Sequence, residues 1–143
     1  MPNFHPLVVH FPIAILTVSI LFDLMAKLLK REEFSRVGWW TQLAGSLGLG
    51  GAVISGLLAE KSINIPDAAR GYFETHEQIA FLNAVIFAVL LLWRIGCRAK
   101  LPQRYQPVFF LIFLVGVIAL WTGAWYGGEM VYRFGTGVGF SPH

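Results

Sequence analysis

The sequence is poor in charge. Only 13% of its 143 residues are charged and 56% are hydrophobic, whereas soluble domains have about 25% charged residues. A soluble domain of this size cannot bury so much apolar side chain. The net charge is only +3, and the basic residues fall in two short blocks that flank apolar runs, which favours a role in membrane topology over nucleic acid binding.

Cysteine and targeting signals are also scarce. Cys97 is the single cysteine, so no disulfide can form within the chain. The first residues lack a cationic segment, and no small-residue cleavage site follows the first apolar run, so we expect that run to be retained as a helix. There is no internal repeat of the length found in solenoid proteins and no long linker. We therefore expect one domain over residues 1–143.

Four segments are long and apolar enough to cross a bilayer, which takes about 20 helical residues. They are approximately residues 6–26, 37–59, 76–94 and 107–126. Thr75 and Gln78 form a possible capping box, which would place His76 near the first helical position. The short connections indicate antiparallel neighbours. The fold class expected is all-α, an integral membrane four-helix bundle followed by a glycine-rich tail, 127–143.

The distribution of basic residues predicts the orientation, because cytoplasmic loops are enriched in Lys and Arg. The first and third connections, with the adjoining helix ends, carry eight: Lys27, Lys30, Arg31, Arg36, Arg94, Arg98, Lys100 and Arg104. The opposite side carries three: Lys61, Arg70 and Arg133. Both termini are therefore expected on the non-cytoplasmic side, which in a bacterium is the periplasmic side of the inner membrane.

This topology gathers polar residues from distant segments at the outer surface. They are His5, His10, Glu60, His76, Glu129, Tyr132 and Arg133. His10 is expected about 6 Å deeper than Pro6, and ionisable groups at such depth usually face the bundle interior and mark a function. Alternatively, His10 is interfacial and bonds to backbone that Pro12 leaves free.

The spacing of the histidines suggests how they could combine. On a continuous helix, His5 and His10 would point about 140° apart, so they are not expected to form a pair on one face. His76 begins the parallel neighbouring helix, which favours a pair of His10 with His76. His5 could then be a third ligand or a supporting hydrogen-bond donor.

The second helix carries small residues at every fourth position: Ala44, Gly48, Ala52 and Gly56, ending at Glu60. Such a row lets either a neighbouring helix or a flat cofactor ring approach closely. Elsewhere at membrane depth, Asn83 is expected to hydrogen-bond across helices. Asp23 is expected to pair with Lys27, one helical turn further along the chain.

The glycine-rich tail follows a transmembrane helix rather than a strand, which argues against a nucleotide-binding loop. We expect a surface-lying or re-entrant flap over the histidine layer. Arg133 in this flap could hold carboxylates, including the propionates of a haem.

Three segments carry a resemblance to a known family. They are His5–Ala14 with its sequence HPLVVHFPIA, Thr75-His76-Glu77, and the run from Gly127 to Tyr132 with the glycines that follow it. The chain resembles the small bacterial membrane proteins catalogued as domain of unknown function 2231, over essentially its whole length. The resemblance implies a four-helix membrane domain and directs attention to His5, His10 and His76.

We consider three functions. The first is an electron-transfer module that binds haem b through His10 and His76, because bundle cores supply imidazoles from facing helices. His5, Gly48, Ala52 and Arg133 would complete the haem site. An outer haem would exchange electrons with a periplasmic cytochrome or with quinone, as part of a respiratory or photosynthetic complex. No enzymatic activity of the chain on its own is expected.

The second hypothesis is a transition-metal site without haem, because imidazole and carboxylate suit zinc, copper or iron. Its ligands would be His5, His10 and His76 with Glu60 or Glu129. The third hypothesis is a structural subunit without a cofactor, which binds other membrane subunits through its small-residue rows.

Overall fold

The computed structural model describes residues 5–61 and 63–137 and is helical throughout this part of the chain, apart from its short connections. The four long helices are α1 (His5–Leu29), α2 (Glu32–Glu60), α3 (Arg70–Gly96) and α4 (Gln106–Tyr132), and a short 3-10 turn, η1 (Asp67–Ala69), precedes α3. All four are long and apolar enough to span a membrane. The expected all-α four-helix fold is confirmed.

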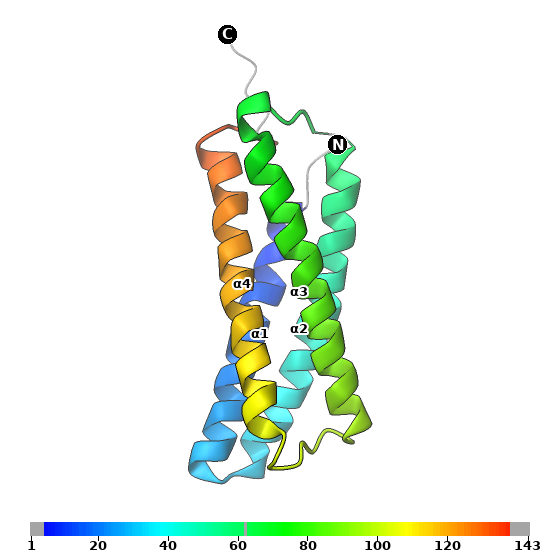
Figure 1. Ribbon diagram of the computed structural model, residues 1–143, viewed down its shortest axis with the longest axis vertical. Helices are drawn as coiled ribbons and strands as arrows, with labels where there is room; N and C mark the ends of the chain where they lie inside the picture. Colours follow the sequence, from blue (N-terminus) through cyan, green and yellow to red (C-terminus); the bar gives the residue numbers. More distant parts are fainter. Residues whose placement is uncertain (1–4, 62, 138–143) are drawn as a thin grey trace.

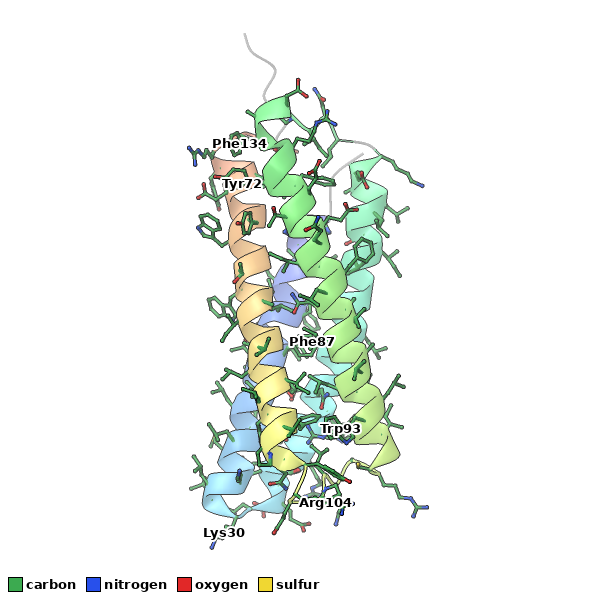
Figure 2. All side chains as sticks on the ribbon, in the orientation of Figure 1. Lys30, Tyr72, Phe87, Trp93, Arg104 and Phe134 are labelled. Atoms are coloured by element: carbon green, nitrogen blue, oxygen red, sulfur yellow. The ribbon has the colours of Figure 1, made fainter. Side chains whose placement is uncertain are left out.

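The helices run alternately up and down, as the short connections predict (Figure 1). The α1–α2 turn and the α3–α4 loop lie at one end, where Figure 2 shows Lys30 and Arg104. We call this the basic end. Tyr72 and Phe134 lie at the opposite end, which we call the histidine end because His5 and His76 belong to it.

The helices at the histidine end are longer than expected. Helix α3 begins at Arg70, well before His76. The Thr75 hydroxyl donates to the Gly71 carbonyl at 2.9 Å inside this helix, so the prediction of a capping box at Thr75 is wrong. Helix α4 continues to Tyr132, so the first residues of the expected flap are helical, while residues 138–143 lie outside the described part.

The bundle consists of two hairpins, α1/α2 and α3/α4, each packed more closely within itself than against the other. Helices α1 and α3 lie diagonally across the bundle. The buried core between the ends is apolar and contains Leu16, Leu49, Phe87, Leu90, Phe109, Phe113, Val117 and Leu120. Many large apolar side chains instead face outward, as expected for a surface covered by lipid.

The small-residue row of α2 is used for helix packing. In this row, a side chain at Gly48 would meet Phe11 and Pro12 of α1. Gly45, beside the row, faces Leu16 of α1. Ala52 is buried. Helix α1 therefore occupies the space in which the sequence allowed either a helix or a cofactor ring.

Candidate functional site: a histidine pair between two hairpins

Two of the candidate histidines meet across the diagonal of the bundle. The ring centroids of His5 in α1 and His76 in α3 are 6.5 Å apart, and the rings are nearly perpendicular, at 83°. Both side chains are half-buried. A metal binds an imidazole nitrogen at about 2.0–2.1 Å, so two imidazoles on opposite sides of one ion would have centroids roughly 6 Å apart. The centroid spacing of this pair is close to that value.

The hydrogen bonds of His5 indicate its tautomer. The Ser55 hydroxyl donates to the Ala52 carbonyl at 2.8 Å, so the Ser55 oxygen accepts in its 2.9 Å contact with His5 Nδ1. The hydrogen therefore lies on Nδ1 in the neutral ring, and the lone pair lies on Nε2.

His76 has the same tautomer for a simpler reason. Its Nδ1 is 2.8 Å from the Gly123 carbonyl oxygen, which can only accept. Metal-binding histidines usually donate their second ring N–H to a carbonyl, carboxylate or water, which fixes the ring and makes the ligating nitrogen more basic. His76 has this support from a carbonyl, and His5 has a comparable bond to the Ser55 hydroxyl.

Glycine brings helices close to both rings. A Cβ at Gly56 would lie 3.0 Å from His5 Cε1, and a Cβ at Gly127 would lie 3.2 Å from His76 Cε1. Each ring is thus held against the backbone of the partner helix in its own hairpin. Gly127 was expected in a surface flap, and the extension of α4 explains why it contacts His76 instead.

His10 is not part of this pair. Its side chain is exposed, and the expected contact of His10 with His76 is replaced by that of His5 with His76. The reason is helix rotation. Buried Pro12 and Asp23 follow His5 by nearly whole numbers of helical turns, so His5 shares their inward face. His10 lies two positions before Pro12. At about 100° per residue, this separation turns His10 to the opposite, outer face of the helix.

The other expected ligands lie apart from the pair or are otherwise engaged. Glu60 is exposed. Arg133 contacts the Glu129 carboxylate at 3.7 Å and the Tyr72 hydroxyl at 3.3 Å. Within residues 5–61 and 63–137, no three His, Cys, Asp or Glu side chains are placed to hold a metal ion. The described site is therefore a pair of histidines.

A family model described as "Predicted membrane protein (DUF2231)" matches residues 1–139. The chain belongs to the DUF2231 family. The resemblance seen in the sequence is therefore confirmed. The match includes the segments that contain His5, His76 and Gly127, which the structure brings together. No curated protein and no solved structure matches this family member.

The structure of this DUF2231 chain also contains a buried ion pair near the basic end, which the sequence analysis missed. Arg94 donates through both terminal nitrogens to Asp23, with one contact at 2.7 Å. It also donates to the Gln42 side-chain oxygen at 2.9 Å and to the Ser35 carbonyl at 3.1 Å. Arg94 is 1% exposed and Asp23 is 7% exposed. The expected pairing of Asp23 with Lys27 is wrong, because Asp23 faces α3.

The stability of the protein should depend on pH through His5, which precedes the apolar span Leu7–Leu29. Burial, and next the charge of His76, lower the pKa of His5 below its ordinary value of 6.5, despite an opposing hydrogen bond to the Ala52 backbone. The unfolded chain thus binds this proton more readily, and stability should fall as pH drops below about 6.5. Thermal unfolding from about pH 5 to 8 checks this. His5→Gln should flatten the profile, and an unchanged profile in this variant would contradict the assignment.

Proposed function

We propose that this protein is a membrane electron-transfer subunit that binds haem b through His5 and His76. The observation that carries the proposal is the geometry of the pair: two half-buried imidazoles 6.5 Å apart, each with Nδ1 bonded to protein. Haem needs only two axial ligands from the protein, and facing helices of a bundle supply them.

The number of ligands favours haem over a site for a bare metal ion. Structural zinc is held by four protein ligands and catalytic zinc by three, whereas the described residues offer a pair. In haem, the porphyrin supplies the remaining ligands. When bound, the haem would supply one-electron redox chemistry, and the two histidines would hold it between the hairpins.

The charge distribution supports an outer location for this site. Arg94 is buried and ion-paired, so it does not count toward the cytoplasmic excess. The basic end still has seven other Lys and Arg residues against three at the histidine end, which predicts the basic end in the cytoplasm. The N-terminus and the histidines would then face the periplasm of a bacterial inner membrane. The electron partner would be a periplasmic cytochrome or a quinone.

A second candidate function is a structural subunit of a larger membrane complex, with or without haem. Side chains at Gly50 and Gly51 of α2 would meet no atom within 4 Å. A second membrane helix could therefore approach this face closely. Because the chain has little mass outside its helices, we expect it to act as part of a larger assembly. A respiratory or photosynthetic complex is the expected host.

An absorption spectrum of the purified protein tests the haem proposal. We expect a Soret band and one haem b per chain after expression with sufficient haem or after titration with haemin. His5→Ala and His76→Ala should each reduce haem affinity by about tenfold or more, because each removes an axial ligand.

His10→Ala is the matched control, because it removes a histidine from the outer face of the same helix. Its haem content should equal that of the wild type. Wild-type protein that shows no Soret band after haemin titration, and yields no haem in acid–acetone extract, would overturn the proposal.

A further inference from the structure

The two hairpins carry equivalent residues at a constant separation in sequence. Asp23 and Arg94, which form the buried ion pair, are 71 positions apart, and the same separation relates His5 to His76. Helices α1 and α3 run in the same direction on opposite corners of the bundle. Both diagonal contacts, at the histidine end and near the basic end, therefore join a residue to its own counterpart.

The helix-packing contacts within the first hairpin also recur in the second hairpin, 71 positions further along the chain. Gly45 faces Ile15 and Leu16, and its counterpart Gly116 faces Ile86 and Phe87, which are the counterparts of those two residues. In the same way, Gly56 faces His5, and its counterpart Gly127 faces His76. The register holds from the first helix of each hairpin to the second without an insertion, although few of the paired residues are identical.

The hydrogen bonds of the histidines repeat as well. The Ala52 carbonyl accepts from the Ser55 hydroxyl at 2.8 Å, and this hydroxyl contacts His5 Nδ1 at 2.9 Å. The carbonyl of the Ala52 counterpart, Gly123, lies 2.8 Å from His76 Nδ1. Contacts of this kind depend on helix rotation and depth together. Apolar composition alone does not reproduce such contacts, because it fixes neither the rotation of a helix nor its depth.

From these repeated contacts we infer that the chain consists of two fused copies of one two-helix unit. The two copies are related by a two-fold axis that runs along the bundle, and the histidine site lies on this axis. Each unit contributes one imidazole, one supporting carbonyl and one glycine, at positions His5, Ala52 and Gly56 or their counterparts. The site belongs to the interface between the units and is incomplete in either one.

This inference rests on the proposed function for its ligand class and deepens it. A site on a two-fold axis offers two equivalent donors, which suits a metal centre with two equivalent coordination positions. A metalloporphyrin held by His5 and His76 would meet this requirement. Ser55 is the exception to the repeat, since Tyr126 stands at its counterpart, and it supports His5 alone.

Exchanging each ligand separately tests the equivalence in the full-length protein titrated with haemin. His5→Met and His76→Met should each raise the reduction potential, because methionine as an axial ligand does so. The two shifts, and the two losses of haem affinity, should agree within about twofold. Loss of binding in one variant with no change in the other would overturn the inference while leaving haem binding intact.

Unfolding without haem supplies a separate readout, should the wild type fail to bind it. Gly56→Val and Gly127→Val should lower the melting temperature by similar amounts, because each added side chain meets the ring of its own histidine. Gly51→Val is the control, since no atom lies within 4 Å of that position. Similar losses support the inference, and a loss at only one of the two glycines overturns it.

Discussion

Replacing Arg94 by methionine should destabilise the bundle by about 3–5 kcal/mol, which is the usual effect of removing one partner of a buried ion pair. The variant leaves the Asp23 carboxylate buried without its guanidinium partner. It also removes the donor to the Gln42 side chain and the Ser35 carbonyl. Reversible unfolding in detergent, followed by tryptophan fluorescence, measures the change.

The double variant Asp23→Leu with Arg94→Met should recover most of this loss. Apolar pairs of similar volume often match or exceed the stability of a buried ion pair, because no charge has to be desolvated. The native cluster is also incompletely satisfied, since Arg94 Nε makes no hydrogen bond within the described residues. A double variant as unstable as Arg94→Met would show that the charges are not coupled.

Replacing Gly38 by alanine should cost about 1–3 kcal/mol, the range for adding volume to a packed interior. A Cβ at this position would lie 2.7 Å from Asp23 Cγ and closer still to one of its oxygens. Asp23 cannot move aside easily, because Arg94 holds both its oxygens. The Ser19 hydroxyl also donates to the Gly38 carbonyl at 2.8 Å, which fixes the backbone here.

Gly50→Ala is the matched control on the same helix, since nothing lies within 4 Å of its Cβ position. It should stabilise the protein slightly, by up to about 1 kcal/mol, because alanine favours a helix over glycine. Opposite signs for the two substitutions are the expected result. If Gly38→Ala were also neutral or stabilising, α2 would not be packed against Asp23 as described.

Hydropathy was sufficient to predict the number of helices and their antiparallel order. Each apolar run matches the bilayer thickness, and the short connections allow few alternatives. The helix ends at the histidine end were harder to predict. The segment from Arg70 to Thr75 contains polar residues, so hydropathy does not assign it to a membrane helix. Thr75 is of a residue type that often caps helices, although it lies inside α3.

The structure brings His5 together with His76 at the histidine end, whereas the sequence analysis paired His10 with His76. Depth along a helix follows from residue number, whereas the direction of a side chain depends on which face is buried. His10 was chosen by depth and is exposed. The inward face could have been found by counting back from Asp23 through Ser19, Leu16 and Pro12 to His5, since these positions share one side of a helix.

The ion pair was missed because its two members suggested separate local explanations. Asp23 has Lys27 one helical turn further on, and Arg94 fits the basic block that sets the orientation. Their contact joins residues 71 positions apart. The correspondence between the hairpins at this separation could not be predicted from the sequence, because few of the paired residues are identical. The contacts in the structure show it.

The ion pair between α1 and α3 also constrains how the chain enters the membrane. Asp23 is synthesised first, and at about 5–20 residues per second Arg94 follows roughly 4 to 14 s later. A charged side chain within a lone helix is costly at membrane depth. Asp23 belongs to the first hairpin and its partner Arg94 to the second, so neither hairpin alone contains both members of the ion pair. The first hairpin should therefore remain beside the insertion machinery, or recruit water, until α3 arrives.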